Sequence, residues 1–239
     1  MELSLRYKDF KTMDNNKESK KAILFGASGF IGANLLQELL NNSDYDQVTI
    51  VVRKSLNIIH PKLKTLIGDF HSLPILNENI DEIFICLGTT LKKTPEKDAY
   101  YQIDHDYAVL SAKIAREKGA KSVFIVTAVG ANANSDLFYI KTKGETERDI
   151  IALGFEHTHI FRPSMLIGTR IENRPFERIL IQAWSAINHV LIGKKLMKYR
   201  GIDGKDVAKA MNNAAKHQTE HVKIYHWKEM NDLNGVRNH

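Results

Sequence analysis

The sequence predicts a doubly wound α/β fold, in which one parallel sheet carries helices on both of its faces. Three observations predict it: short continuous apolar runs, amphipathic segments that alternate with them, and a glycine-rich loop after the first run. Continuous apolar strands are typical of parallel sheets that are buried on both faces. We expect one domain over residues 21–239, preceded by an extension, residues 1–20, whose apolar residues would form one edge of a short helix.

The elements follow one another with clear boundaries. Ile31, Leu35 and Leu39 recur at helical spacing after the first strand. Gly119 and Gly154 are expected to end helices, and Ser135 to cap one. The last residues are expected to fray. In order we predict a strand at 22–26, a helix at 30–42, strands at 47–53, 63–69 and 81–88, a helix at 106–119, a strand at 122–130, a helix from 135 or 136 to 153, a strand at 157–163, helices at 176–191 and 203–217, and a strand at 221–227.

The bulk properties exclude several classes of protein. The net charge of +6 and the pI of about 9.2 suit an anionic ligand, but the lysine pairs are scattered, so nucleic-acid binding is not expected. The single cysteine, Cys86, lies in an apolar run, which predicts a buried thiol and a reducing compartment. No apolar stretch approaches about 18 residues and no hydrophobic signal core is present. We therefore expect a cytoplasmic protein without membrane insertion.

The loop "GASGFIG" carries the strongest functional signal. Gly26, Gly29 and Gly32 follow a strand and open a helix, which is the context that dinucleotide binding requires. Gly26 would make the turn, Gly29 would admit the pyrophosphate, and Gly32 would let the helix pack closely on the sheet. The helix N-terminus would present N–H groups to the phosphates. The same stretch adds Ser28, Phe30 and Ile31 to the predicted cofactor site.

The end of the second strand selects the cofactor. An NAD site usually has an acidic residue there, whereas this chain has Arg53 and Lys54. A guanidinium can pair with a 2′-phosphate through charge-assisted hydrogen bonds. We therefore expect NADP(H) to be favoured over NAD(H); the alternative is that both side chains are only solvated.

Two further strand ends add predicted cofactor contacts. Asp69, after the third strand, is placed to accept a hydrogen bond from an adenine amino group. The run "CLGTT" ends the fourth strand, where Gly88 lets the backbone approach a ligand. Ligands bind at the carboxyl ends of strands in such sheets. The predicted contacts in this run are Leu87, Gly88, Thr89 and Thr90.

Tyr139 and Lys143, in "YIKTKGE", lie four residues apart and so on one face of a helix. A lysine ammonium beside a phenol lowers the pKa of the tyrosine from about 10 toward neutrality. A catalytic pair and two surface neighbours are the alternatives, and the phosphate loop upstream favours the first. His157 and His159 share one side of a strand, but no third ligand has convincing spacing, so we expect no metal site.

The motifs "GASGFIG", "CLGTT", "YIKTK" and "FRPSMLIG" with "ENRP" together resemble an atypical short-chain dehydrogenase/reductase. The resemblance is greatest to the Tat-interacting-protein subgroup, NADPH-binding proteins of the Rossmann fold that were first met as transcription cofactors. It covers nearly the whole chain. It implies that Tyr139 protonates a carbonyl oxygen as hydride arrives, that Lys143 also holds the nicotinamide ribose, and that Pro163 and Ser164 lie near the nicotinamide.

One departure from the family concerns the end of the fifth strand. The family usually has a serine there that orients the substrate oxygen, and the subgroup often has two. Here Thr127 and Ala128 occupy the pair. Thr127 would substitute as a catalytic hydroxyl, although its β-branching restricts the direction of Oγ1. Arg162 is expected to pair with helix carboxylates.

Three candidate functions follow from these observations. The first is an NADPH-dependent oxidoreductase that reduces a carbonyl or oxidises an alcohol of a small molecule, with specificity set by a lobe formed by residues 164–239. The second is an NADPH-binding regulatory or sensor protein that acts through a protein partner. A third and weaker alternative is nucleic-acid binding through the basic segment at 193–201.

Overall fold

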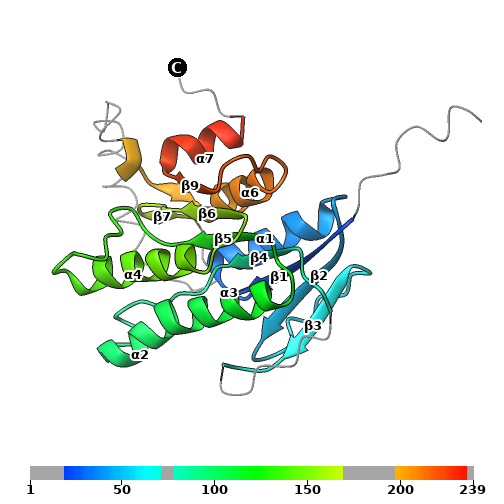
Figure 1. Cartoon of the computed structure of the whole chain (residues 1–239), viewed down its shortest axis with the longest axis horizontal. Coiled ribbons are helices and arrows are strands. Elements are labelled where there is room, and N and C mark those ends of the chain that lie inside the picture. The colour runs from blue at the N-terminus through cyan, green and yellow to red at the C-terminus, as the bar shows by residue number, and fades with distance from the viewer. Residues whose placement is uncertain (1–18, 71–77, 169–196, 236–239) are drawn as a thin grey trace, which may run out of the picture.

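A computed structural model describes residues 19–70, 78–168 and 197–235 of the chain, and it confirms the doubly wound fold. Seven strands form one sheet in the order β3-β2-β1-β4-β5-β6-β9, and every neighbouring pair is parallel (Figure 1). The chain order reverses between β1 and β4, which places a switch point there. The strands are β1 (Lys20–Phe25), β2 (Tyr45–Val52), β3 (Leu63–Ile67), β4 (Glu82–Ile85), β5 (Ser122–Val126), β6 (His157–Phe161) and β9 (Val222–Tyr225).

Helices cover both faces of this sheet (Figure 1). α3 and α4 lie over one face, while α1 and α6 pack together over the other. A short second sheet joins β7 (Leu166–Ile167) to β8 (Ile202–Asp203). The helical segments are α1 (Phe30–Asn41), α2 (Lys97–Tyr101), the π-helical turn η2 (Gln102–Asp106), α3 (Tyr107–Glu117), α4 (Phe138–Ala152), the single 3₁₀ turn η3 (Met197–Tyr199), α6 (Gly204–Ala214) and α7 (Trp227–Leu233).

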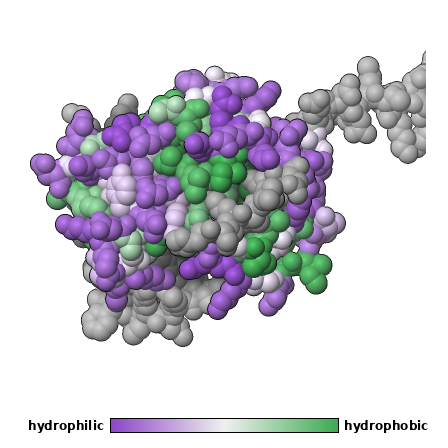
Figure 2. All heavy atoms as spheres, turned by 60° about the horizontal axis from the view of Figure 1, so that its bottom comes forward, coloured by the Kyte–Doolittle hydropathy of each residue, from purple (hydrophilic) through white to green (hydrophobic). Residues whose placement is uncertain are grey.

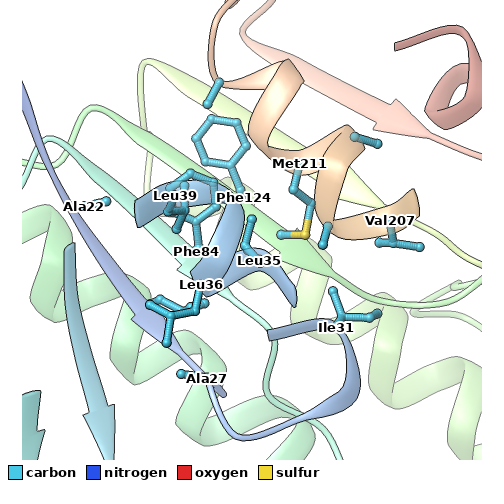
Figure 3. Packing of buried hydrophobic residues seen from close by; sticks show 14 of the residues in the cluster. Ala22, Ala27, Ile31, Leu35, Leu36, Leu39, Phe84, Phe124, Val207 and Met211 are labelled. Atoms are coloured by element: carbon cyan, nitrogen blue, oxygen red, sulfur yellow. The ribbon is translucent and has the colours of Figure 1, made fainter. Parts of the chain in front are cut away.

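The sheet separates two apolar clusters, because successive strand residues point to opposite faces. In β1, Leu24 belongs to the cluster under α1 and α6, whereas Ile23 belongs to the cluster under α3 and α4. Figure 3 shows Leu35 of α1 and Met211 of α6 meeting above the aromatic residues of the sheet. Both faces are therefore dry, which explains why the strands read as continuous apolar runs.

The two helix ends predicted from glycines are confirmed, and two predicted helix starts are wrong. Gly119 and Gly154 follow α3 and α4 with φ of +94° and +70°, the left-handed conformation that ends helices. Ser135 does not cap α4. The helix begins at Phe138, and the Ser135 hydroxyl instead accepts the N–H of Leu137 at 3.2 Å in a turn before it. The chain also becomes helical earlier than predicted before α3, because α2 and η2 extend that helix toward its N-terminus.

The C-terminal part of the chain completes the central sheet. β9 pairs with β6, and α6 packs against α1. The chain was predicted to fray after the last strand, but it forms the helix α7 there. Near the start of α7 the His226 N–H donates to the Glu229 carboxylate at 2.9 Å. The helix predicted at 176–191 and the short helix predicted within 1–20 lie outside the described residues.

The surface is mostly hydrophilic on the face drawn in Figure 2, where apolar side chains gather in a central band. Within the described ranges, no helix is both long and apolar enough to cross a membrane.

Candidate functional site

The phosphate loop has the form that its three glycines predict. Gly26 has φ of +87°, and a Cβ on Gly32 would lie only 2.1 Å from the Gly26 carbonyl oxygen. The helix therefore approaches the strand as closely as a backbone allows. Gly29 caps α1, and among the described residues no side chain caps that helix or places an acidic group in its first turn. Ser28 and Gly29 are exposed, so the positive end of α1 faces an open backbone cradle that fits a phosphate.

The two apolar residues of this loop face inward. Ile31 is buried in the core under α1. The Phe30 ring packs beside the start of α6, where a Cβ on Gly204 would lie 2.6 Å from its Cε1 atom. A Cβ on Gly168, after β7, would also lie 2.8 Å from this ring. Their side chains therefore hold the loop in place, and only their backbone remains for a ligand.

The loop meets the end of β4 at the switch point. A Cβ on Gly26 would lie 2.5 Å from the Cys86 carbonyl oxygen, so the two strand ends touch through their backbones. Cys86 is half-buried against the core just after β4, and burial of its thiol raises its pKa to about 12, which leaves little reactive thiolate at neutral pH. Leu87 is half-buried, while Gly88 and Thr90 are exposed directly after this contact.

Basic side chains follow β2 on the open side of the sheet. Arg53 and Lys54 are exposed, and neither makes a hydrogen bond or an ion pair with another residue in the part of the chain that the structure describes. After β3, Asp69 is exposed and Phe70 stacks on Tyr107 with ring centroids 4.1 Å apart. Because β2 and β3 are neighbours, these predicted cofactor residues lie at one edge of the sheet.

α4 brings the predicted catalytic pair to the loop after β4. Lys143 is buried, and a Cβ on Gly88 would lie 3.8 Å from its Nζ atom. Tyr139 lies one turn earlier and keeps 40 % of its surface exposed, with its ring edge-on to Tyr100 at 6.5 Å. The structure thus joins "CLGTT" and "YIKTK" in one place.

Asp104, which the sequence reasoning missed, lies at the centre of this place. Its carboxylate forms an ion pair with Lys143, accepts the Thr89 N–H at 2.7 Å and accepts the Tyr100 hydroxyl at 3.3 Å. Asp104 is 2 % exposed and belongs to the π-helical turn η2. Such turns are rare and often occur at functional sites. The available signal was an aspartate among apolar and aromatic residues, with Tyr100, Ile103 and Ala108 near it in the sequence.

The pKa of Tyr139 corrects one sequence-based expectation. Burial is the largest influence and raises the pKa above 10; Lys143 lowers it, and Asp104 raises it. The net direction is upward, so the prediction of a pKa lowered toward neutrality is wrong. Its physical reason is that the ring loses water on its packed side, and that Asp104, which pairs with Lys143, offsets part of the effect of the lysine.

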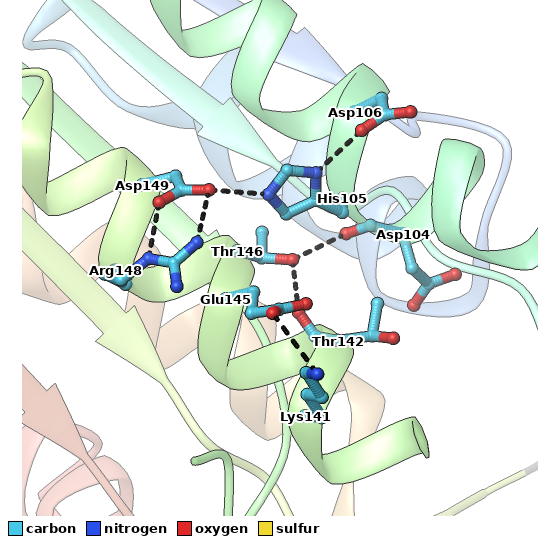
Figure 4. Close-up of polar contacts among 9 residues, drawn as sticks. All are labelled: Asp104, His105, Asp106, Lys141, Thr142, Glu145, Thr146, Arg148 and Asp149. Atoms are coloured by element: carbon cyan, nitrogen blue, oxygen red, sulfur yellow. Dashed lines mark hydrogen bonds and ion pairs between the residues drawn. The ribbon is translucent and has the colours of Figure 1, made fainter. Parts of the chain in front are cut away.

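Figure 4 shows a second polar cluster on the same turn. His105 bridges Asp106 at 2.7 Å and Asp149 of α4 at 2.9 Å, and Arg148 pairs with Asp149. Arg148 is the main reason that the pKa of Asp149 falls to about 2. The Thr146 hydroxyl lies 3.1 Å from the Asp104 carbonyl oxygen. These contacts fasten η2 to α4.

The Thr127 hydroxyl is engaged within the protein and is not directed at a substrate position. It is buried, and its hydroxyl donates to Glu147 Oε1 at 2.6 Å. Arg162 holds the same carboxylate through Nε and Nη2 at 2.9 and 2.5 Å, which confirms the predicted pairing with a helix carboxylate. The neighbouring Ala128 is buried and has no hydroxyl.

The segment after β6 completes the surroundings. Pro163 is buried, and its carbonyl oxygen accepts the Val129 N–H at 2.9 Å. The Ser164 hydroxyl donates to the Tyr199 carbonyl oxygen at 2.7 Å. The chain around these predicted contacts is thus fixed to the ends of β5 and η3.

No group of three metal-ligating side chains occurs within residues 19–70, 78–168 and 197–235. His159 is fully buried and stacks on Phe124 with ring centroids 4.6 Å apart. His157 Nδ1 lies 3.0 Å from the Glu220 carbonyl oxygen. Both rings are engaged in the fold.

A glycine loop under a helix N-terminus, next to strand ends that meet at a switch point, defines a dinucleotide-binding protein of the Rossmann class. Residues 26–183 match the NAD(P)H-binding family. The chain belongs to this family, which confirms the resemblance that the motifs predicted.

Three curated relatives place it further. Protein FMP52, mitochondrial, of Kluyveromyces lactis is 36 % identical over 85 % of this chain and 93 % of that protein. The FMP52 protein of Candida glabrata is 37 % identical over 62 % of this chain and 65 % of that protein. Protein HTATIP2 of Rattus norvegicus is 33 % identical over 69 % of this chain and 70 % of that protein. These names define no substrate.

The names also correct the expected location. The yeast relatives are called mitochondrial, and this contradicts the cytoplasmic location that the sequence predicted. The prediction rested on the lack of a hydrophobic signal core, which speaks only to one kind of targeting segment.

Solved structures agree on the fold. MoeE5 in complex with UDP-glucuronic acid and NAD matches with a TM-score of 0.64 and 18 % identity over 91 % of this chain and 83 % of that one. UDP-N-acetylglucosamine 4-epimerase from Methanobrevibacter ruminantium matches with a TM-score of 0.64 and 20 % identity over 87 % and 76 %. At these identities the likeness concerns the fold alone.

Proposed function

We propose that the protein is an NADPH-dependent oxidoreductase of the short-chain type that acts on a carbonyl or an alcohol. The observation that carries the proposal is that Lys143 lies against the loop after β4. Its Nζ atom is 3.8 Å from the position that a Cβ on Gly88 would occupy. The segment predicted to bind a cofactor and the segment predicted to do chemistry therefore share one place. That place is the carboxyl edge of the sheet, where ligands of such folds bind.

In this proposal the residues divide the work by position. When bound, the reduced dinucleotide supplies a hydride for a carbonyl carbon. Tyr139 donates a proton to the carbonyl oxygen, because it is the exposed acid of the cluster. Lys143 holds the nicotinamide ribose. The cofactor is held by Gly26, Ser28, Gly29, Phe30, Ile31, Gly32, Arg53, Lys54, Asp69, Leu87, Gly88, Thr89, Thr90, Pro163 and Ser164.

We leave Thr127 out of the proposed catalytic group. Its proton is donated to Glu147, and that carboxylate is already held by Arg162. The hydroxyl thus belongs to a buried network under the strand end. The oxygen-orienting donor of the family has no counterpart at Ala128.

In this proposal fewer residues form the substrate lobe than the range 164–239 that the sequence predicted. β9, α6 and α7 belong to the central sheet and its helical layer. Of the described residues, those that remain to set specificity lie around the short β7–β8 sheet, in 164–168 and 197–203.

Replacing Tyr139 by phenylalanine tests the proposal. Removing a general acid lowers turnover by about 10²–10⁴-fold, while NADPH affinity should stay unchanged. Tyr101→Phe, which removes a hydroxyl outside the cluster, is the matched control. Carbonyl reduction followed by NADPH absorbance gives the first quantity, and NADPH fluorescence gives the second. Equal turnover in Tyr139→Phe and wild type would contradict the proposal.

A regulatory NADPH-binding protein is the second candidate. The commitment of Thr127 to Glu147 and the lack of a hydroxyl at Ala128 favour it. It predicts tight NADPH binding, no turnover over a broad panel of carbonyl compounds, and a protein partner whose binding changes with NADPH. Turnover of any such compound that Tyr139→Phe abolishes would exclude it.

The relatives' names also lead us to propose a mitochondrial location for this protein. Cell fractionation of the full chain with a C-terminal tag tests this. We expect the tag to sediment with mitochondrial markers, and recovery in the soluble fraction alone would contradict it.

A further inference from the structure

Asp104 is the one buried carboxylate within the described part of the proposed site, and every contact it makes there is with a donor. The Lys143 ammonium, the Thr89 N–H and the Tyr100 hydroxyl surround it, and its side chain is 0 % exposed. Three donors around one acid are satisfied by its ionised form, which only accepts hydrogen bonds. Lys143, whose side chain is 8 % exposed, is thus half of a neutral pair.

This pairing changes what the lysine can do for Tyr139. A lone ammonium one helical turn away stabilises a phenolate, whereas an ion pair with no net charge does so much less. The titratable groups that bear on the Tyr139 hydroxyl are Lys143 on its own helix, Asp104 on η2 and Tyr100 on α2. Burial is the largest influence and raises the pKa of Tyr139 above its usual value; Lys143 lowers this pKa, and Asp104 offsets part of the effect of Lys143.

We propose that Asp104 is a positioning residue that helps to set the protonation state of the catalytic acid. By pairing with Lys143 it adds to the effect of burial and keeps Tyr139 as a phenol at neutral pH, the form that protonates a carbonyl oxygen, so the site is suited to catalyse carbonyl reduction faster than alcohol oxidation at this pH. This inference rests on the proposed oxidoreductase function. Alcohol oxidation would need Tyr139 as a phenolate base, which this arrangement makes scarce.

The step balances with the groups named. The carbonyl carbon receives a hydride and its electron pair from the reduced dinucleotide, which is oxidised. The carbonyl oxygen receives the proton of the Tyr139 hydroxyl as the π bond breaks. The resulting phenolate regains a proton from solvent, which reaches its partly exposed ring.

The native protein gives the first test, without substrate or turnover. The near-ultraviolet absorbance of tyrosinate is titrated in wild type and in Tyr139→Phe, and their difference isolates Tyr139. We expect no ionisation of Tyr139 below a pH of about 9, because an ordinary tyrosine titrates near 10. Ionisation of Tyr139 below a pH of about 9 would overturn the inference.

Asp104→Asn gives the second test, because it keeps the shape of the side chain and removes its charge. We expect Tyr139 to ionise at a lower pH than in wild type, since the effect of Lys143 is then no longer offset. Asp106→Asn removes the same charge from the exposed side of the same turn, where Asp106 contacts His105. It should leave the titration unchanged. An unchanged titration in Asp104→Asn, with circular dichroism showing a folded protein, would overturn the inference.

The two proposals fail in different ways. If Tyr139→Phe keeps full turnover, the oxidoreductase assignment fails. If turnover is lost in that variant but Asp104→Asn leaves the Tyr139 titration in place, only the role of Asp104 fails. A purely structural role for Asp104 would lower stability without moving this titration.

Discussion

Two buried ion pairs lie one turn apart on α4, and they differ in what surrounds them. Lys143 and Asp104 border the exposed Gly88 and the partly exposed Tyr139. Glu147 and Arg162 are closed over by Thr127 and the end of β6. The same helix face thus carries one pair next to an exposed strand end and one pair that fastens the sheet. The difference teaches that burial alone does not distinguish a candidate catalytic charge from a structural one, whereas a neighbouring exposed strand end does.

Breaking the ion pair between Glu147 and Arg162 should have the largest effect on stability. Arg162→Met leaves Glu147 buried without its cation, and we expect the free energy of unfolding to fall by about 3 kcal/mol. NADPH affinity of the folded protein should stay within about twofold of wild type, a change worth about 0.4 kcal/mol. Urea unfolding and NADPH fluorescence measure the two quantities.

The double variant Glu147→Leu with Arg162→Met is the control, because replacing both charges removes the unpaired group. It should recover most of the lost stability. A loss of NADPH binding in Arg162→Met that equals the loss in Lys143→Met would erase the distinction between the two pairs.

His159 extends the comparison to a buried group that has no ion-pair partner among the described residues. Burial lowers its pKa from 6.5 to about 4. Between these values the unfolded chain binds a proton that the folded protein does not, so stability falls as pH falls through this window. The penalty is absent above 6.5 and complete below 4, and it reaches about 3 kcal/mol. In His159→Gln the free energy of unfolding should fall less steeply with falling pH across this window than in wild type. An identical slope would contradict the lowered pKa of His159.

Ala128→Ser sharpens the comparison at the end of β5. The change supplies a hydroxyl where the family has one, next to Thr127, whose own hydroxyl donates to Glu147. We expect turnover to rise about 10²-fold, because one such donor to the substrate oxygen is worth about that much. Thr127→Ser, which keeps the contact with Glu147, should leave turnover unchanged. A steady-state assay on the same carbonyl compound measures both. No gain in Ala128→Ser would favour the regulatory alternative.

Two arginines at strand ends give the smallest expected effect. Arg162 is held by Glu147, whereas Arg53 is exposed without such a partner among the described residues. Arg53→Ala should weaken NADPH binding about tenfold, since an exposed charge-assisted contact is worth roughly 1.4 kcal/mol. NADH binding should not change. Lys113→Ala, an exposed change of the same charge on α3, is the control, and equal weakening of both cofactors would count against 2′-phosphate recognition.

The sequence predicted the fold well because the fold depends on local patterns. Apolar runs such as 122–126 need both faces buried, and three glycines after one strand have few structural uses. Helix ends with glycine were also predicted, because left-handed φ is a local property. Ser135 failed as a cap because a serine can close a turn just before a helix as readily as it can cap one.

The chemistry of the site was less predictable because it depends on distant contacts. Asp104 reaches Lys143 only because η2 packs against α4, 39 positions along the chain from one residue to the other. The direction of the Thr127 hydroxyl depends on Glu147 and Arg162, which come from two other elements. The spacing of Tyr139 and Lys143 therefore predicted where the candidate site lies, but the predicted lowering of the Tyr139 pKa was wrong.

A crystal structure with NADPH tests the central claim most directly, namely that α4 and the loop after β4 form one nicotinamide site. We predict the nicotinamide ring beside Tyr139, its ribose hydroxyls within hydrogen-bond distance of Lys143 Nζ, and the 2′-phosphate on Arg53. A bound dinucleotide whose nicotinamide lies away from Tyr139 and Gly88 would contradict the account.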